Sequence, residues 1–345
     1  MKAVVIDRFV QNYDEVHVSS VPPPRPRGDE ILIQVKAAGV NFVDTLYARG
    51  LHQNNQRHVK PPFTLGLEFS GLVVSSPRSC PWKAGSRVFG AASGSYSEYL
   101  VVPASQSHTL HPIPASWTFA QAACLGATIP VSYGALRQRG GLRSGETVLV
   151  HSAAGGLGLA AVQLAVALGC RVIGTAGSDA KCRTVERFGA ERCLNYSTSS
   201  KWSDEVLKFT GGKGVDVVFD PVGLVADSLR CLAHRGRVLV VGFAGREGNM
   251  EGVKMNRVLL KQATLIGYRF GESDRRDPTE TAKIWEELWP LVTDGKIKPT
   301  VYDQDYLGLE SVPKALGDIA SRKTWGKAVI KVSGQEGEDF RQAKL

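Results

Sequence analysis

A glycine-rich segment near the middle of the chain has the residue types and spacing that phosphate binding requires. The short apolar run Thr147–Val150 leads into Ala153-Ala154-Gly155-Gly156-Leu157-Gly158, and an apolar stretch then continues to Leu168. This order predicts a strand, a tight turn and the start of a helix, where backbone N–H groups can meet a pyrophosphate without obstruction by side chains. Ala153 replaces the first glycine of the common G-x-G-x-x-G pattern, so the strand and the helix on either side carry the prediction. The alternative is a glycine-rich turn without a ligand.

The next strand-like run, Arg171–Thr175, ends in a segment that indicates which dinucleotide binds. NAD-binding folds place an acidic residue there, which accepts a hydrogen bond from the ribose and would repel a 2′-phosphate. Here Gly177 has no side chain, Ser178 can donate a hydrogen bond and Lys181 supplies a positive charge. We therefore predict NADPH as the cofactor. Asp179 is a contrary sign unless it points away, and the alternative is that Ser178 only caps a helix and Lys181 is a surface charge.

These two motifs lie where predicted strands and helices alternate along the chain. Repeated β-α-β units predict an α/β fold with a doubly wound parallel sheet and helices on both faces. The first hundred residues are instead β-rich, with little helical periodicity. The predicted strands are Met1–Ile6, Glu30–Val40, Thr147–Val150, Arg171–Thr175, Val215–Phe219, Arg237–Val241, Thr264–Ile266 and Ala328–Val332; the predicted helices are Phe119–Leu125, Val131–Leu136, Gly156–Leu168, Asp179–Phe188, Val225–Leu232, Ala282–Val292 and Val312–Ala320.

Composition limits the class of protein. The 345 residues, 43% of them hydrophobic, suffice for two domains with buried cores. The net charge of +9 is spread along the chain, so we expect an anionic small ligand and no nucleic-acid partner. No apolar run reaches the ~18 residues that a membrane span needs, so we expect no membrane partner. The six cysteines lack C-x-x-C spacing, which favours reduced thiols and a cytoplasmic protein.

Further segments resemble a known superfamily. They are Gly39-Val40-Asn41-Phe42-Val43-Asp44 followed by Arg49-Gly50, Gly66-Leu67-Glu68-Phe69-Ser70-Gly71, and Gly326-Lys327-Ala328-Val329-Ile330. Together with the glycine-rich turn they resemble the medium-chain dehydrogenase/reductase superfamily, and specifically its zinc-free quinone oxidoreductase branch, the zeta-crystallin-like enzymes. The resemblance extends from Met1 to Val332. It implies a GroES-like β-rich catalytic domain, split in sequence, with an inserted Rossmann domain.

The resemblance also implies domain boundaries and an assembly. Residues 1–118 would form the first part of the GroES-like catalytic domain, 119–268 the Rossmann NADPH-binding domain, and 269–345 the return to the catalytic domain and a polar tail. A homodimer is expected, with the last Rossmann strand, within Ala263–Gly267, at the subunit edge.

The resemblance bears on metal binding as well. Zinc-dependent members of the superfamily hold zinc with a cysteine, a histidine and a second cysteine at positions that match Asn41, Leu67 and Ala127 here. None of these side chains supplies a thiolate or an imidazole, so we predict no metal site. Without a Lewis acid, hydride transfer to an electron-poor quinone or conjugated carbonyl compound is the expected chemistry.

Roles for individual residues follow from the resemblance. The glycine-rich turn would bind the pyrophosphate, Ser178 and Lys181 the 2′-phosphate, and Asn41 would lie beside the nicotinamide ribose. Tyr196 would lie along the adenosine. Asn41 as a turn cap and Lys327 as a surface lysine are the alternatives. The predicted cofactor-binding residues are Asn41, Gly155, Gly156, Leu157, Gly177, Ser178, Lys181, Tyr196, Lys327 and, at the nicotinamide pocket, Gly242, Phe243 and Ala244.

Two departures from the family pattern affect the acceptor pocket. Leu46 stands where the family usually has an aromatic residue, with Tyr47 next to it, and Val131 replaces a threonine before Ser132-Tyr133. Tyr47 is the candidate catalytic proton donor, because its phenol could hydrogen-bond a substrate carbonyl; the alternative is a core tyrosine.

Three functions therefore stay open. The first is NADPH-dependent quinone reduction, the second is reduction of an enone or enoyl thioester, and the third, of another class, is a non-catalytic NADPH-binding sensor or interaction protein. The final residues Ala343-Lys344-Leu345 resemble a peroxisomal Ser-Lys-Leu signal, and a chance tripeptide on a cytoplasmic enzyme is the alternative.

Overall fold

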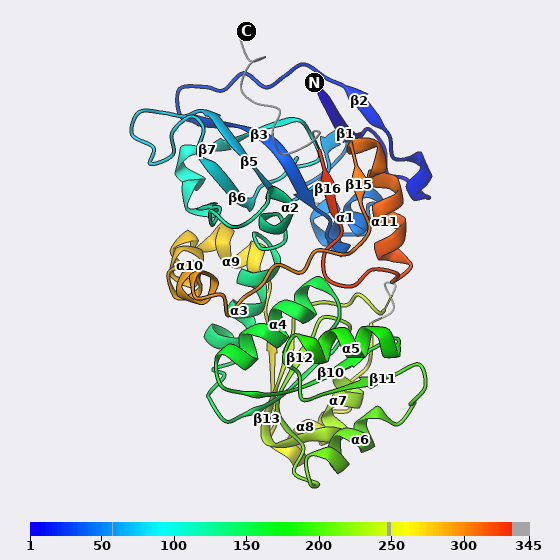
Figure 1. The fold of residues 1–345 in the computed structure, drawn as a ribbon. Coiled ribbons are helices and arrows are strands. Elements are labelled where there is room, and N and C mark those ends of the chain that lie inside the picture. Colours follow the sequence, from blue (N-terminus) through cyan, green and yellow to red (C-terminus); the bar gives the residue numbers. More distant parts are fainter. Residues whose placement is uncertain (57, 247–249, 333–345) are drawn as a thin grey trace. The chain divides into compact units, whose positions relative to one another are not determined.

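The computed structural model describes residues 1–56, 58–246 and 250–332 (Figure 1). The chain forms two compact units. Unit 1 consists of Met1–Ala127 and Val301–Leu345, and unit 2 consists of Thr128–Thr300. The first unit is thus split in sequence by the second, as expected.

Unit 1 is β-rich, as the first hundred residues predict. Its larger sheet has the strand order β15-β16-β3-β5-β6-β8, with β7 also paired to β3, and a smaller sheet has the order β2-β1-β4. The strands are β1 (Lys2–Ile6), β2 (Val18–Ser20), β3 (Glu30–Gly39), β4 (Phe63–Thr64), β5 (Glu68–Ser75), β6 (Arg87–Ala91), β7 (Tyr99–Pro103), β8 (Leu110–Pro112), β15 (Tyr306–Leu307) and β16 (Val329–Lys331). The α-helices are α1 (Phe42–Ala48), α2 (Phe119–Ala122) and α11 (Val312–Ala320), and the short 3-10 helices are η1 (Tyr13–Glu15), η2 (Gln53–Gln56), η3 (Ala104–Thr109) and η5 (Leu309–Ser311).

Strand β3 organises the larger sheet, because β5, β7 and β16 all pair with it. Ile31, Ile33 and Val35 are buried and alternate with partly exposed neighbours, as expected of a strand, which confirms the strand predicted for this segment. Strand β16 pairs antiparallel with the end of β3, with Ile330 opposite Ala38. The end of the described chain is therefore brought next to the residues that follow β3.

Unit 2 is a parallel sheet with the strand order β11-β10-β9-β12-β13-β14. Every neighbouring pair in this order is parallel. The strands are β9 (Thr147–Val150), β10 (Arg171–Ala176), β11 (Arg192–Asn195), β12 (Val215–Asp220), β13 (Leu232–Val240) and β14 (Thr264–Gly267). The helices are α3 (Thr128–Tyr133), the π-helical segment η4 (Gly134–Arg139), α4 (Gly156–Ala167), α5 (Asp179–Arg187), α6 (Trp202–Phe209), α7 (Val225–Cys231), α8 (Met255–Lys261), α9 (Phe270–Arg276) and α10 (Pro278–Thr293).

Both faces of the parallel sheet are covered. On one face Leu149 and Val218 pack in a core cluster with Trp202 of α6 and Leu229 of α7. Because side chains alternate along a strand, Val148 points to the opposite face, and it is also fully buried. These contacts confirm the doubly wound α/β arrangement that the sequence predicts.

The unit boundaries differ from the expected 118/119 and 268/269. Helix α2 lies with unit 1, where Ser70 Oγ donates to the carbonyl oxygen of Phe119 at 2.6 Å. Helices α9 and α10 lie with unit 2, where Tyr133 Oη on α3 donates to Glu287 on α10 at 2.7 Å. Long-range contacts of this kind determine the unit boundaries, and the hydrophobic periodicity of a local segment does not indicate them.

The region after Thr118 is less regular than the apolar periodicity predicts. The predicted helix Phe119–Leu125 is a single turn, α2, and the predicted helix Val131–Leu136 is divided between α3 and the π-helical segment η4. A Cβ at Gly134, where η4 begins, would overlap the Tyr268 hydroxyl. The wide turn therefore begins where glycine lets an aromatic side chain pack against the backbone.

Two further expectations concern the cell rather than the fold. None of the helices that the structure describes is long and apolar enough to cross a membrane. The six cysteines all lie in described residues and are buried free thiols. Ala343-Lys344-Leu345 lies outside the described residues, so the peroxisomal signal stays a prediction.

Candidate cofactor-binding and active-site residues

The glycine-rich turn of unit 2 joins β9 to α4. Gly155 is the N-cap residue of α4 and offers no side chain to the first N–H groups of this twelve-residue helix. The turn is tight: Ser152 has a φ of +48° and its carbonyl accepts from the Gly155 N–H at 2.9 Å. A Cβ at Gly158 would overlap the Ser152 carbonyl oxygen. The predicted residues Gly155, Gly156 and Leu157 therefore present backbone at a helix N-terminus, which suits a pyrophosphate.

The predicted 2′-phosphate residues gather at the carboxyl ends of β10 and β11. Ser178 caps α5, with its oxygen 3.4 Å from the Lys181 N–H. A Cβ at Gly177 would lie 2.8 Å from the Tyr196 hydroxyl, so these two residues are packed together. Tyr196 remains 40% exposed. The structure thus brings Gly177, Ser178 and Tyr196 to one edge, where open α/β sheets bind ligands.

Asp179, the contrary sign in the cofactor prediction, has a partner. Asn195 Nδ2 donates to its carboxylate at 2.8 Å, from the end of the adjacent strand β11. The carboxylate is therefore held by a side chain at the end of the adjacent strand. Both roles of Ser178, capping and phosphate contact, are compatible with this geometry.

A buried carboxylate that the sequence reasoning missed shapes the next loop. Asp220, at the end of β12, is fully buried and accepts from the N–H groups of Val222, Gly223 and Leu224 at 2.8, 2.8 and 2.6 Å. The sequence signal was an acid at a strand end followed by a Pro-x-Gly turn. The Ala244 N–H in turn donates to the Pro221 carbonyl at 3.0 Å, so Asp220 indirectly supports the predicted Gly242-Phe243-Ala244 segment. Phe243 is 43% exposed there.

His151, which opens the glycine-rich turn, is a second buried polar group. Its ring nitrogens lie 3.0 Å from Thr175 Oγ1 and 2.9 Å from Ser228 Oγ. Burial lowers the pKa of His151, which favours a neutral ring. The histidine therefore ties β9 to β10 and α7 beneath the turn.

In unit 1, Asn41 belongs to a group of polar side chains from three distant segments. Lys327 Nζ lies 2.6 Å from Asn41 Oδ1 and 2.6 Å from Glu68 Oε2. Asn41 Nδ2 donates to the same Glu68 oxygen at 3.2 Å, and the Ala127 N–H donates to Glu68 Oε1 at 2.7 Å. Glu68 and Lys327 are buried and Asn41 is partly exposed. The sequence singled out Asn41 and Lys327, but not that they touch.

A second buried acid lies next to Asn41. Asp44 Oδ2 accepts from the Asn41 N–H at 2.8 Å and from the Tyr96 hydroxyl at 2.6 Å. Its other oxygen, Oδ1, has no hydrogen-bond partner within the described ranges. Burial raises the pKa of Asp44 to about 6, against the lowering effect of Tyr96, the Asn41 N–H and the Lys327 charge.

Tyr47, the predicted proton donor, lies on α1, which begins directly after Asn41. Its side chain is 9% exposed, and its hydroxyl oxygen accepts from Asn54 Nδ2 at 2.7 Å. The ring stacks near His52, with centroids 4.4 Å apart. The catalytic role of Tyr47 stays a prediction.

The residues at the positions that hold zinc in zinc-dependent members do not fit that metal. Asn41 and Leu67 offer no soft or imidazole ligand, and the third position contributes only the Ala127 N–H, which is bound to Glu68. The Lys327 ammonium already places a positive charge against Asn41 and Glu68. Among the residues that the structure describes, no group of three His, Cys, Asp or Glu side chains could hold a metal ion.

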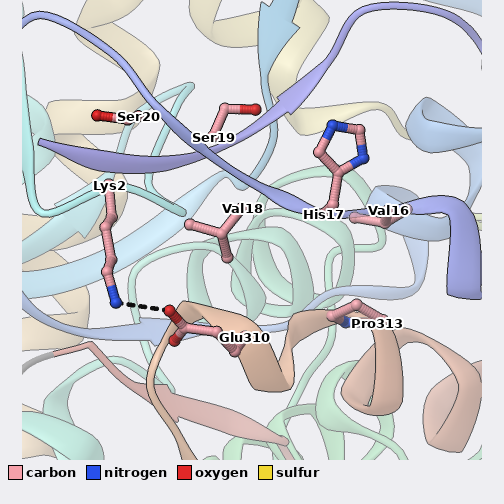
Figure 2. A pocket seen from close by; sticks show the side chains of 8 residues that line it. All are labelled: Lys2, Val16, His17, Val18, Ser19, Ser20, Glu310 and Pro313. Carbon is pink, nitrogen blue, oxygen red and sulfur yellow. Dashed lines mark hydrogen bonds and ion pairs between the residues drawn. The ribbon is translucent and has the colours of Figure 1, made fainter.

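A surface pocket of about 520 Å³ lies elsewhere in unit 1 (Figure 2). Lys2 and Glu310 line it and form an ion pair at 2.7 Å, and His17 is a further lining residue. None of the predicted site residues lines this pocket. It is therefore separate from the group around Asn41.

Comparisons with known proteins agree with the two-unit organisation. Residues 27–115 match the family of alcohol dehydrogenase GroES-like domains, and residues 156–292 match the zinc-binding dehydrogenase family. Quinone oxidoreductase-like protein 2 of Rattus norvegicus is 37% identical over 319 residues, covering 89% of this chain and 86% of that protein.

Two solved structures have the same fold over nearly the whole chain. A probable oxidoreductase from Mycobacterium abscessus is 35% identical with a TM-score of 0.84, covering 96% of this chain and 98% of that one. The Escherichia coli quinone oxidoreductase complexed with NADPH is 29% identical with a TM-score of 0.84, covering 96% of this chain and 100% of that one.

Proposed function

The chain belongs to the quinone oxidoreductase branch of the medium-chain dehydrogenase/reductase superfamily, and from that premise we propose that it reduces a quinone with NADPH and without zinc. It is an oxidoreductase with a nicotinamide-cofactor fold. The observation that carries the proposal is the occupation of the zinc positions by Asn41, Leu67 and the Ala127 N–H, with the Lys327 ammonium against Asn41.

The cofactor choice is supported by the end of β10. Ser178 stands there with a hydroxyl, Lys181 contributes a cation one turn on, and Asp179 is bound by Asn195. A 2′-phosphate finds a donor and a positive charge at this edge. The Escherichia coli relative, whose structure contains NADPH, is consistent with this choice.

The predicted residues would bind different parts of NADPH. When bound, NADPH would supply a hydride, which carries two electrons. Gly155, Gly156 and Leu157 would hold its pyrophosphate by backbone N–H groups, and Asn41 would orient its nicotinamide ribose. A quinone that accepts a hydride needs one further proton to become a hydroquinone, and water can supply it.

A conjugated enone is the second candidate acceptor. It is favoured by one observation: Tyr47 lies on the helix that begins after Asn41, so its phenol and the Asn41 amide are carried by one short element. An enone needs a proton at carbon, which a positioned phenol can deliver.

A stopped-flow experiment tests these proposals. The protein, treated with chelator and checked for residual zinc, is mixed with NADPH or NADH and with 1,4-benzoquinone, 9,10-phenanthrenequinone or an α,β-enone. We expect NADPH-selective oxidation with quinones. Turnover of the enone alone would replace the quinone proposal with the alkene-reductase one. Tight NADPH binding without turnover of any acceptor would instead support a non-catalytic sensor or interaction protein.

The assembly proposed is a homodimer through the edge of the parallel sheet. Strand β14 is the last strand of that sheet, and Leu265 in it is 37% exposed. Helix α8, which precedes it, exposes Leu259 and Leu260 at 76% each. An uncovered strand edge beside exposed leucines favours pairing with a second copy. Sedimentation of a monomer at micromolar concentration would contradict it.

The free cysteines bear on location. All six are buried thiols, which fits a reducing compartment such as the cytoplasm.

A further inference from the structure

The ion pair of Lys327 and Glu68 is unusual in its burial. The two side chains are 2% and 0% exposed, and their charged atoms lie 2.6 Å apart. Taking two charges out of water costs free energy that their attraction at best offsets, so such pairs are often no more stabilising than apolar residues of the same volume. A contribution to stability therefore gives a weak reason for this pair.

The ion pair has a definite effect on the amide of Asn41. An ammonium group can only donate hydrogen bonds, and a carboxylate can only accept them. Lys327 Nζ lies 2.6 Å from one end of the amide, and Glu68 Oε2 lies 3.2 Å from the other. The amide oxygen must therefore face Lys327 and the amide nitrogen must face Glu68, because the reverse orientation sets donor against donor and acceptor against acceptor.

This orientation determines what Asn41 can offer to a ligand. The amide nitrogen donates to Glu68 and, at 3.4 Å, to the Gly39 carbonyl, which accounts for both of its hydrogens. The oxygen accepts from Lys327, and an amide oxygen has two lone pairs. Since Asn41 is partly exposed while the charges behind it are buried, the ligand would meet a hydrogen-bond acceptor. A ribose hydroxyl is a suitable donor.

We propose that the Lys327–Glu68 ion pair is a positioning device that fixes the Asn41 amide as a hydrogen-bond acceptor for a ribose hydroxyl in the nicotinamide half of the cofactor. The inference rests on the proposed function for the identity of the ligand. Lys327 and Glu68 are then positioning residues, which act through Asn41 and do not touch the cofactor.

The test uses a neutral-pair variant, Glu68→Gln combined with Lys327→Met. It removes both charges together, keeps an oxygen for the Ala127 N–H and leaves neither member of the pair buried without the other. The dissociation constants of NADPH and of adenosine 2′,5′-bisphosphate, which lacks the nicotinamide ribose, are measured for wild type, the neutral-pair variant, Asn41→Ala and the triple variant. Thermal unfolding of each is recorded alongside.

We expect the neutral-pair variant to bind NADPH about tenfold more weakly than wild type, or about 1.4 kcal/mol, and to bind the bisphosphate unchanged. In the Asn41→Ala background the same pair of substitutions should change NADPH binding less than twofold, since its effect passes through Asn41. The control Lys331→Met, four residues after Lys327 in the chain but in an exposed ion pair with Asp305, should bind both ligands as wild type does.

Two results would overturn the inference. One is unchanged NADPH binding in the neutral-pair variant. The other is a general structural role, which would appear as equally weakened NADPH binding with and without Asn41, or as weakened binding of both NADPH and the bisphosphate. The proposed function fails differently: a wild type that binds NADPH but reduces no quinone contradicts the reaction, while the coupling to Asn41 would still support the positioning role.

Discussion

In unit 2 the predicted pyrophosphate site consists of backbone, whereas in unit 1 the group around Asn41 consists of side chains. The turn before α4 occupies consecutive residues and depends on the small size of Gly155 and Gly158. The Asn41 group joins residues 286 positions apart and depends on one buried cation and one buried anion.

This difference teaches which substitutions each site can tolerate. A backbone site is sensitive to added volume and depends less on the identity of the side chains, because its hydrogen-bond donors belong to nearly every residue type. A side-chain site of buried charges is sensitive to the loss of either partner, because the remaining charge stays desolvated. We therefore expect added volume to damage the site in unit 2 and the loss of one charge to damage the site in unit 1.

The largest effect is expected from removing the buried cation alone. Lys327→Met leaves the Glu68 carboxylate buried with only hydrogen-bond donors, which costs about 3–5 kcal/mol of unfolding free energy. Adding Glu68→Gln should restore most of the loss. Urea unfolding at pH 7.5 measures both, with Lys331→Met as the exposed control. Equal stability of Lys327→Met and wild type would show that the site in unit 1 does not depend on its buried cation, contrary to the comparison of the two units.

Asp44 sharpens the comparison by making unit 1 sensitive to pH. Its pKa is about 6 in the folded protein, against 3.8 ordinarily, so the contribution of Asp44 to stability is fully present below pH 3.8 and is lost as pH rises to 6. The loss amounts to about 3 kcal/mol. Asp44→Asn keeps an acceptor for Tyr96 and removes the titration.

The measurement is urea unfolding of both proteins at pH 4 and pH 7. From pH 4 to pH 7 the free energy of unfolding of wild type should fall relative to that of Asp44→Asn, because only wild type has the Asp44 carboxyl group to ionise. A difference between the proteins that is the same at both pH values would show that Asp44 does not titrate in this window.

In unit 2 the added volume of one methyl group is the matching probe. Gly158→Ala places a Cβ against the Ser152 carbonyl oxygen, which should cost about 1–3 kcal/mol of stability and weaken NADPH binding more strongly than the loss of any single charge nearby. Calorimetry with NADPH measures both effects. Gly271→Ala, in a helix where a Cβ has open space, is the control. Normal binding by Gly158→Ala would mean that the turn can widen.

The smallest effect concerns the 2′-phosphate. Ser178→Ala and Lys181→Ala should each raise the KM for NADPH about tenfold, or about 1.4 kcal/mol, and leave the KM for NADH unchanged. Lys213→Ala, just before β12 and thus at the opposite edge of the sheet, should alter neither. An equal rise for both cofactors would mean that Ser178 acts as a helix cap and Lys181 as a surface charge.

The local features of the fold could be predicted from the sequence. The strand Thr147–Val150 and helix α11 have the predicted bounds, and α4 ends one residue before the prediction, because periodicity and glycine placement act over a few residues. The π-helical segment after Tyr133 could not be predicted, since it depends on Tyr268 packing against Gly134 from another part of unit 2.

The candidate site divides in the same way. The glycine-rich turn could be predicted because its residues are consecutive in the sequence. The contacts of Lys327 with Asn41 and Glu68 accompany the pairing of β16 with β3, and nothing in the local sequence indicates that a lysine just before the last strand is buried. Glu68 carried one signal, an acid at the start of a largely apolar strand, that the sequence reasoning did not use.

The late return of β16 to β3 also sets an order of events during synthesis. Residues 37–39 pair with β16 along one side of β3, where β7 pairs only with residues 30–34, so this end of β3 lacks its partner on that side while the ribosome makes all of unit 2. Unit 2 is continuous and can fold as soon as it emerges. Through that interval Glu68 has no cation and Asn41 no fixed amide. The Asn41 amide of the nascent chain can therefore be fixed for ligand binding only after Lys327 has left the exit tunnel.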